Sequence, residues 1–201
     1  HTKFIDATVH DGLWCAIGDV HMGSYGDRMA KEFGVSREEQ DRWAYRSHMR
    51  ALDAQKAGRL AEEIVPVEVP QRKGPPVIFD TDEQPRPDTS LEKLAKLRPV
   101  FSPDGTVTAG NAPSLNDGGA ALLIMAREKA EALGLEPLAT IISQGFVSQE
   151  APYLATVPYL SIKQAAERLG MALSDLELVE INEAFAAVAV VATRMGGWPE
   201  D

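Results

Sequence analysis

The sequence predicts an α/β fold with two unlike parts. Residues 1–115 mix short helical and extended patterns with proline-rich loops, which is typical of an irregular α+β domain. Residues 116–201 read as helix, strand, helix, strand and helix, and this order indicates a layered α/β domain. The apolar content of 44% is ordinary for a globular protein and is sufficient for a buried core.

The first part contains a clear sequence pattern for the start of a helix. Ser36 and Glu39 have the spacing of a capping box, in which each side chain satisfies a free backbone donor of the other residue. The helix that they begin is expected to end at Gly58. Residues 64–69 then read as a strand, and the proline within them indicates a sheet edge.

The rest of the first part is expected to be mostly loop. Prolines and mixed charges fill residues 71–89 and predict irregular structure. Ser90 is expected to cap a short helix that ends before Pro99, because a residue that precedes proline is pushed out of the helical region.

In the second part, Asn116 or Asp117 is expected to cap an alanine- and leucine-rich helix that ends at Gly134. Residues 138–147 are expected to form a buried strand. Ser161 and Gln164 form a second capping-box pattern, whose helix is expected to stop at the glycine at position 170.

The last two predicted elements frame the most informative stretch of the chain. Residues 176–181 alternate and predict a strand, whereas the alanine-rich residues 187–192 predict a buried helix that stops at a pair of glycines. Between them lies Asn182-Glu183-Ala184-Phe185-Ala186. Ligands of open α/β folds gather where a strand ends and a helix N-terminus offers free N–H groups. An asparagine amide at this corner can hold a water or polarise an oxygen without carrying charge. The structural alternative is that Asn182 caps the helix and Glu183 favours its first turn.

Further motifs, in order along the chain, make the sequence resemble the thiolase family. Besides the stretch that starts at Asn182, they are His21-Met22-Gly23, Lys96-Leu97-Arg98-Pro99-Val100-Phe101, Gly105-Thr106-Val107-Thr108-Ala109-Gly110-Asn111-Ala112 and Leu115-Asn116-Asp117-Gly118-Gly119-Ala120. The resemblance implies a partial thiolase-like layered fold. Residues 1–115 would be its coenzyme A-binding loop domain, and residues 116–201 the first part of its C-terminal core domain. The implied activity is that of an acyl-CoA C-acyltransferase, which makes or cleaves 3-ketoacyl-CoA by reversible Claisen condensation.

Other parts of the thiolase pattern are missing. The family uses a nucleophilic cysteine in its N-terminal half, and a Gly-His-Pro histidine and a Cys-x-Gly cysteine near its C-terminus. This sequence has one cysteine, Cys15, where the family has no catalytic residue, and it has no Gly-His-Pro. We therefore expect the chain to be an internal piece of a longer enzyme and to be inactive by itself.

The resemblance assigns one catalytic residue and two contacts to coenzyme A. Asn182 would hold the water that, together with a histidine, stabilises the enolate oxygen. His21 would hydrogen-bond the pantetheine amides. Arg86 would lie beside the adenine ring and the phosphates, with Lys93, Lys96 and Arg98 adding positive charge. The structural alternatives are a loop histidine that is satisfied by backbone and a solvated loop arginine.

The resemblance also implies a set of residues around the acyl chain. The expected wall residues are Met22, Phe101, Leu154, Ala184 and Phe185, and each of them has core packing as its alternative. Leu154 stands where the family often has methionine. Ser114 is expected to take over a pantetheine contact, because the neighbouring position, often serine in the family, is Pro113 here.

The composition limits the kinds of partner that the chain is expected to bind. The net charge of −10 and the sequence pI of about 4.9 argue against non-specific nucleic-acid binding. A lone cysteine cannot form an internal disulfide, and neither zinc-ligand spacing nor a membrane-spanning run is found in the sequence. The expected partners are acyl-CoA and coenzyme A as substrates, without a further cofactor, and a second copy in a homodimer or homotetramer. The expected setting is fatty acid metabolism in the cytoplasm, or in the mitochondrion or peroxisome of a eukaryote.

Two other interpretations stay open. The chain is either this enzyme piece or a non-catalytic coenzyme A-binding or scaffold protein derived from a thiolase, and Asn182 favours the enzyme because a pure binder does not need it. A ketoacyl synthase relative shares the layered fold, but that class uses acyl carrier protein and lacks the large coenzyme A-binding insertion. The sequence leaves the acyl chain length and the net direction of the reaction open.

Overall fold

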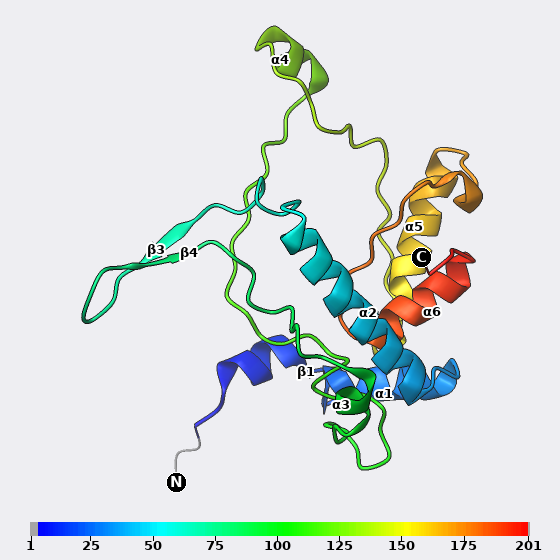
Figure 1. Cartoon of the computed structure of the whole chain (residues 1–201). Helices are drawn as coiled ribbons and strands as arrows, with labels where there is room; N and C mark the ends of the chain where they lie inside the picture. The colour runs from blue at the N-terminus through cyan, green and yellow to red at the C-terminus, as the bar shows by residue number, and fades with distance from the viewer. Residues whose placement is uncertain (1–3, 201) are drawn as a thin grey trace.

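The computed structural model describes residues 4–200, and four helices form its core (Figure 1). These are α1 (Met22–Glu32), α2 (Arg37–Lys56), α5 (Val157–Arg168) and α6 (Ala186–Gly196). The shorter elements are η1 (Thr8–Leu13), β1 (Trp14–Cys15), β2 (Val20–His21), β3 (Val67–Val69), β4 (Val77–Phe79), α3 (Leu91–Ala95), α4 (Arg127–Ala132), η2 (Ala151–Tyr153) and η3 (Leu173–Asp175). Strands β1 and β2 form one antiparallel hairpin, and β3 and β4 form another.

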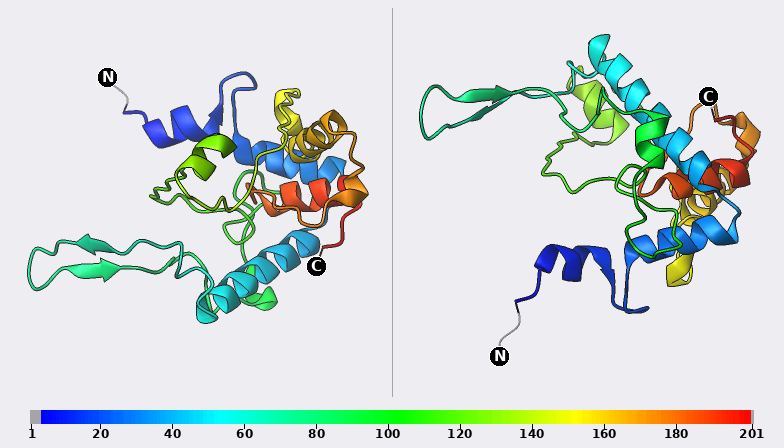
Figure 2. Two further views of the ribbon diagram at one scale, coloured as in Figure 1. Left: turned by 90° about the horizontal axis from the view of Figure 1, so that it is seen from above. Right: turned by 60° about the horizontal axis from the view of Figure 1, so that its bottom comes forward.

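Helix α6 lies at the centre, in contact with α1, α2 and α5 (Figure 2). Its residues from Ala186 to Thr193 are all buried, which requires a helix without a polar face. Small alanine and valine side chains allow the neighbouring helices to approach closely. The helix ends at Gly197, whose φ of 67° is left-handed, and Trp198 N–H then bonds to the Thr193 carbonyl at 3.2 Å. The predicted buried helix and its glycine stop are confirmed.

In the first part of the chain, two helices begin at the residues that were predicted to cap them. Glu39 N–H donates to Ser36 Oγ at 3.2 Å, and Ser36 N–H donates to the Glu39 carboxylate at 2.8 Å, so the capping box of α2 is confirmed. The helix ends just before Gly58, as expected. Ser90 caps α3 by accepting Lys93 N–H at 3.2 Å. The buried Leu94 of α3 faces α2, and this contact keeps the segment before it close to α2.

A buried polar network joins α2 to the chain before α6. Asp41, which is 4% exposed, accepts from Arg37 Nε at 2.8 Å and from Asn111 Nδ2 at 3.0 Å. Arg37 also donates to the carbonyls of Leu94 and Leu97. The Asn111 carbonyl accepts the N–H of Ala186, the first residue of α6, at 3.0 Å. This network therefore holds α2, the loop at Asn111 and the start of α6 in one arrangement.

The predicted strands 138–147 and 176–181 are wrong for this structure. Neither segment has regular secondary structure, and neither pairs with another strand within residues 4–200. Leu138, Ile141 and Leu178 are 106%, 76% and 88% exposed. A strand needs a hydrogen-bonded partner as well as an alternating pattern, and the described residues do not supply one.

Four other predictions need correction. The strand expected over 64–69 is shortened to β3, and the loop expected over 71–89 contains its partner β4. The helix expected from Asn116 begins only at Arg127, because the apolar residues before it are extended; its end at Gly134 is confirmed by a left-handed φ of 66°. Ser161 does not cap a helix, since α5 already begins at Val157 with a proline in its first turn, whereas the stop at Gly170 is confirmed.

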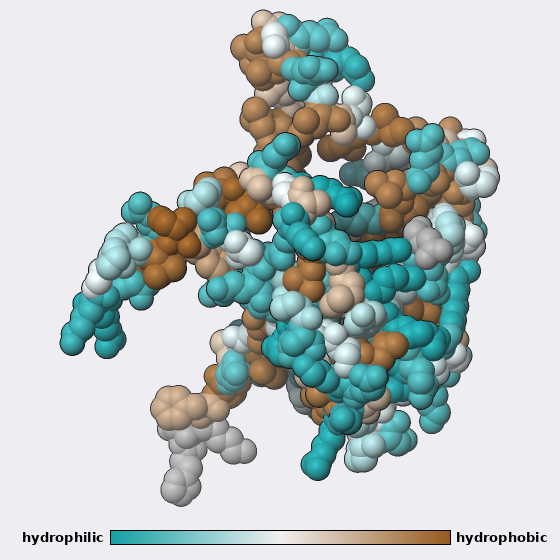
Figure 3. All heavy atoms as spheres, viewed as in Figure 1, coloured by the Kyte–Doolittle hydropathy of each residue, from teal (hydrophilic) through white to brown (hydrophobic). Residues whose placement is uncertain are grey.

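The molecule exposes more surface than its size requires. Its accessible area is 14986 Å², whereas the scaling for compact monomers gives about 9,300 Å² for this mass. The hairpin β3–β4 projects from the body with all six residues exposed, and the segments on either side of α4 are also extended (Figure 1). Figure 3 shows hydrophobic surface on both of these projections. No helix within residues 4–200 is long and apolar enough to cross a membrane.

Candidate functional site

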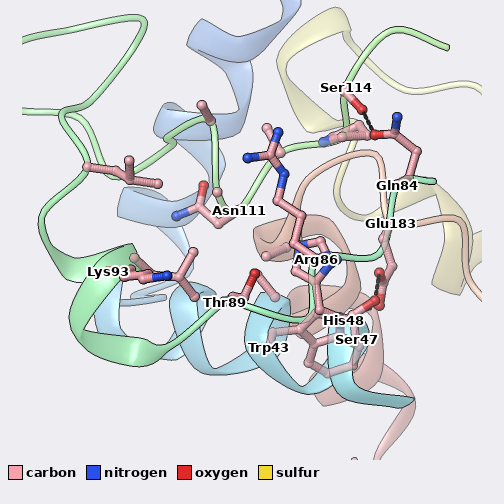
Figure 4. A pocket seen from close by; sticks show the side chains of 18 of the residues that line it. Trp43, Ser47, His48, Gln84, Arg86, Thr89, Lys93, Asn111, Ser114 and Glu183 are labelled. Carbon is pink, nitrogen blue, oxygen red and sulfur yellow. Dashed lines mark hydrogen bonds between the residues drawn. The ribbon is translucent and has the colours of Figure 1, made fainter. Parts of the chain in front are cut away.

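The main pocket of the described residues has a volume of about 820 Å³ and lies beside α2 (Figure 4). One face of α2 forms its floor with Trp43, Ala44, Ser47 and His48. Its walls come from three other segments, which are residues 84–97, 109–116 and 180–186. The pocket therefore brings together parts of the chain that the sequence places far apart.

Three predicted site residues line this pocket, namely Arg86, Ser114 and Asn182. All three side chains are exposed to solvent in the described chain. The Asn182 side-chain amide takes part in no hydrogen bond among residues 4–200, and its carbonyl accepts the N–H of Ala184 at 2.9 Å. The amide is therefore available to a water or a ligand in the pocket.

The structural alternative for Asn182 is wrong. The N-cap position of α6 is occupied by Phe185, and no side chain caps this helix. Its first N–H group instead finds the carbonyl of Asn111. The alternative for Glu183 is wrong as well, since the first turn of α6 contains no acidic residue. Both residues lie in the loop before the helix, and neither side chain caps it.

Glu183 has partners that the sequence did not indicate. Its carboxylate accepts Trp43 Nε1–H and the Ser47 hydroxyl, each at 2.6 Å, with one oxygen for each donor. Trp43 and Ser47 are one turn apart on α2 and more than 130 positions away from Glu183 in sequence, as their separations of 140 and 136 show.

The segment that carries Arg86 is tied to the same helix. Arg86 N–H donates to His48 Nδ1 at 3.2 Å, and Gln55 Nε2 donates to the Asp82 carbonyl at 2.7 Å. Partial burial lowers the pKa of His48, and the positive charge of Arg86 lowers it further, while Glu183 opposes these effects. His48 is thus neutral at pH 7, and its unprotonated Nδ1 can accept the backbone bond.

Positive charge in the pocket comes mainly from Arg86. Its guanidinium makes no hydrogen bond with residues 4–200, so it is available to an anion. Lys93 also lines the pocket, but its ammonium donates to the Asp88 carboxylate at 2.8 Å and to the Asp88 carbonyl at 2.6 Å. Lys93 accordingly lowers the pKa of Asp88. Lys96 and Arg98, predicted to add charge here, do not line the pocket.

Ser114 lies at the rim of the pocket. Its hydroxyl bonds to the Gln84 side chain, from the segment of Arg86, and to Asn116 Oδ1 at 3.0 Å (Figure 4). Ser114 therefore joins two walls of the pocket through hydrogen bonds between side chains. Its predicted contact with pantetheine stays a prediction.

The predicted residues His21, Phe101 and Phe185 form a separate aromatic cluster. The rings of His21 and Phe101 stack with centroids 4.6 Å apart, and Phe185 meets Phe101 edge-on at 6.5 Å. His21 is also the N-cap of α1, because its Nδ1 accepts Gly23 N–H at 3.0 Å. The ring hydrogen is therefore on Nε2, which leaves that nitrogen as a donor for a ligand.

Gly23 permits this cluster to form. A Cβ at position 23 would lie only 2.0 Å from the Phe101 ring, so a larger residue would push the ring away from His21. Both ends of the motif His21-Met22-Gly23 therefore have a structural role. His21 caps α1, and Gly23 leaves room for the Phe101 ring to approach the backbone.

The remaining wall residues show the packing role that was their alternative. Leu154, Ala184 and Phe185 pack against the buried core cluster around α1 and α6, and Met22 opens α1 in a half-buried position. Packing against the core and lining an acyl channel are compatible for a half-buried side chain. The role of these residues toward an acyl chain stays a prediction.

The sequence matches a known protein family along most of its length. Residues 1–128 match the family described as Thiolase, N-terminal domain, and residues 135–201 match Thiolase, C-terminal domain. The chain belongs to the thiolase family. The two matched regions meet between residues 128 and 135, and the finer division into 1–115 and 116–201 stays a prediction.

Particular relatives agree with this family. The chain is 48% identical to the acetyl-CoA acetyltransferase of Pseudomonas aeruginosa, over 98% of this chain and 50% of that protein. It is 44% identical to a probable acetyl-CoA acyltransferase of Staphylococcus epidermidis, again over 98% of this chain and 50% of the relative. The chain thus spans about half the length of the curated relatives it matches.

A solved structure confirms the fold class. The crystal structure of the Bacillus anthracis acetyl-CoA acetyltransferase superimposes with a TM-score of 0.94 at 38% sequence identity. The match covers 99% of this chain and 50% of that one. The predicted partial thiolase-like fold is therefore confirmed, although two of the expected strands lack partners within residues 4–200.

Proposed function

We propose that this chain is one half of an acyl-CoA C-acyltransferase that makes or cleaves 3-ketoacyl-CoA by reversible Claisen condensation. The observation that carries the proposal is the shared pocket, which both Asn182 and Arg86 line although they lie far apart in the sequence. An unengaged amide suits an enolate oxygen, and an unengaged guanidinium suits a phosphorylated carrier. The relatives, which are named as an acetyl-CoA acetyltransferase and a probable acetyl-CoA acyltransferase, support the same chemistry.

In this proposal each half of the enzyme has a separate task. A cysteine thiolate from the other half attacks the first acyl thioester and releases coenzyme A. The α-carbon of the second thioester loses a proton to a basic group of the other half, and its enolate attacks the acyl-cysteine. The new carbon–carbon bond forms while the carbon–sulfur bond breaks and the cysteine leaves as a thiolate. A water on the Asn182 amide donates to the enolate oxygen while charge develops there. The role of Arg86 is to hold the phosphates and the adenine ring of the carrier.

The wider setting of this function is also a proposal. The substrates are acyl-CoA and coenzyme A, with no further cofactor. The complete enzyme, in which this chain is joined to the half that the relatives also possess, is a homodimer or homotetramer that serves fatty acid metabolism in the cytoplasm. The family resemblance supports the substrates and the assembly, whereas the acidic composition and the single cysteine support the cytoplasm, with the mitochondrion or peroxisome as the alternative in a eukaryote. The acyl chain length is left open.

The 201-residue chain alone is expected to have no thiolase activity. Its one cysteine, Cys15, lies on the hairpin β1–β2 and does not line the pocket. Gly18 and the Tyr25 hydroxyl lower the pKa of its thiol, yet a more acidic thiol in the wrong place cannot attack the substrate. We expect no cleavage of acetoacetyl-CoA by the purified chain, measured as loss of its absorbance in the presence of coenzyme A.

The matched control is the Cys15→Ser variant, which is expected to behave as the parent chain does. Cleavage by the parent chain that disappears in Cys15→Ser would show that this cysteine is the nucleophile and would overturn the proposal. A complete protein that binds coenzyme A but never cleaves acetoacetyl-CoA would favour the non-catalytic binding protein instead.

Arg86 is expected to serve affinity and not chemistry. In the complete enzyme, Arg86→Ala removes a charge-assisted contact to phosphate, each of which typically contributes about 1.5–3 kcal/mol. We expect KM for acyl-CoA to rise roughly tenfold or more while kcat changes little, because the contact exists equally in the ground and transition states. Steady-state kinetics measures both. Lys96→Ala, which removes a charge outside the pocket, is the control. An equal fall in kcat and kcat/KM would contradict the binding role.

A further inference from the structure

The loop that carries Asn182 has few attachments to the rest of the molecule. Residues 177–183 donate no backbone hydrogen bond to another part of the described chain. Asn182 itself is exposed, and its amide makes no hydrogen bond within residues 4–200. A catalytic amide gains little from a loop that moves, since a misplacement of about 1 Å can cost a hundredfold in rate. Some other contact must hold this loop beside the pocket.

The contact is the side chain of Glu183, the next residue. One carboxylate oxygen accepts Trp43 Nε1–H and the other accepts the Ser47 hydroxyl, both at 2.6 Å. Because the two donors lie one turn apart on the same face of α2, both carboxylate oxygens are held at once and the group cannot rotate. Figure 4 shows the bond from Ser47 on the floor of the pocket.

The donors themselves are well fixed. Trp43 packs against the buried core cluster, and the Arg46 guanidinium lies over its ring at 4.4 Å from the centroid. Ser47 is an interior residue of a helix of 20 residues. The helix thus presents two fixed donors to one carboxylate of a loop that has few other attachments.

We propose that Glu183 is a positioning residue, which fixes the Asn182 amide beside the pocket by binding Trp43 and Ser47 of α2. The proposal rests on the function proposed above for Asn182. It assigns the carboxylate a geometric task that a neutral hydrogen-bonding group of the same shape can also perform. Glu183 touches neither substrate nor proton in this role.

The same helix holds the coenzyme A-binding segment. His48 follows Ser47, and its Nδ1 accepts the N–H of Arg86 at 3.2 Å. Adjacent residues of α2 therefore set the position of the predicted catalytic loop and of the predicted phosphate contact. One helix therefore sets the separation between the segments that carry Asn182 and Arg86. This arrangement suits acyl-CoA, whose acyl end and phosphate end must both be bound.

The proposal predicts different results for Glu183→Gln and Glu183→Ala in the complete enzyme. Glutamine keeps one oxygen for Trp43, and its NH₂ can donate to Ser47 Oγ, so we expect kcat to fall by no more than about threefold. Alanine removes both bonds and so leaves the loop without this attachment, and we expect kcat to fall roughly 10- to 30-fold with KM nearly unchanged. Ser47→Ala is expected to cost about threefold, and nothing more in the Glu183→Ala background.

Glu200→Gln is the matched control, because Glu200 also reaches α2, at Arg46, but does not line this pocket. We expect unchanged kcat and KM for it. A second measurement uses the 201-residue chain: in nitrogen–proton NMR, the Trp43 indole signal should move in Glu183→Ala and stay near its place in Glu183→Gln.

The outcomes separate this inference from the proposed function. If Asn182→Ala abolishes condensation but Glu183→Ala leaves kcat unchanged, the positioning role is wrong and the enzyme proposal stands. Equal losses in Glu183→Gln and Glu183→Ala would show that the charge acts directly, which also overturns positioning. If Asn182→Ala has no effect on condensation, the proposed function itself fails. If the position of the Trp43 indole signal does not change in Glu183→Ala, the structural basis of the inference is removed.

Discussion

Asn182→Ala in the complete enzyme is expected to slow carbon–carbon bond formation by roughly 10²–10³, the typical cost of one lost oxyanion donor. The reason is that the water on the amide meets a charge that develops only in the enolate, whereas the neutral thioester makes a weaker demand. Acylation of the cysteine is expected to be affected less, because its tetrahedral intermediate places the negative charge on a different oxygen. Rapid-quench measurements separate the two steps, with labelling by acyl-CoA preserved and condensation lost.

The control for this experiment is Asn116→Ala, another exposed asparagine at the pocket, whose side chain accepts from Ser114. It is expected to leave condensation within about threefold of the parent enzyme, as loss of an ordinary exposed hydrogen bond implies. If labelling and condensation fall together in Asn182→Ala, or if the variant is merely unstable, Asn182 is not the residue that serves the enolate.

Asp41→Ala is expected to have the largest effect on stability, lowering the free energy of unfolding by about 3–5 kcal/mol. The substitution leaves the Arg37 guanidinium without its counter-ion and Asn111 Nδ2 without one of its two acceptors. Because Asn111 also holds the start of α6, the loss extends to the pocket. Urea unfolding of the 201-residue chain, followed by tryptophan fluorescence, measures the change.

Glu38→Ala provides the comparison on the same helix. Glu38 is an exposed carboxylate in the first turn of α2 and takes part in no hydrogen bond or ion pair within residues 4–200. Its loss removes only a favourable interaction with the helix dipole, of about 0.3–1 kcal/mol. A similar small change for Asp41→Ala would contradict the importance that we give to the buried network.

Local signals predicted the parts of the fold that depend on neighbours in sequence. The capping box at Ser36, the cap at Ser90 and the left-handed stops at Gly134, Gly170 and Gly197 all involve bonds across a few residues, so the sequence contains the whole interaction. The buried helix α6 was predictable for a similar reason, since a long apolar run of alanine and valine tolerates no exposed face.

Interactions between distant segments were not predictable in this way. The strand expected over 138–147 has the right alternation but no partner among residues 4–200, and alternation alone cannot state where a partner lies. Likewise the bonds from Trp43 and Ser47 to Glu183 span most of the chain. The family motifs indicated Asn182 and Arg86, but only the fold shows that they line one pocket.

The unpaired extended segments on either side of α4 affect how the chain can be handled. Leu122, Leu123, Ile141 and Phe146 are at least 70% exposed, and the extended residues 117–125 and 138–146 make no backbone-to-backbone hydrogen bonds within residues 4–200. Apolar side chains combined with open strand edges promote association between identical molecules. The chain produced by itself is therefore expected to associate at high concentration, and lysine substitutions at these positions would keep it in solution for the NMR and unfolding measurements.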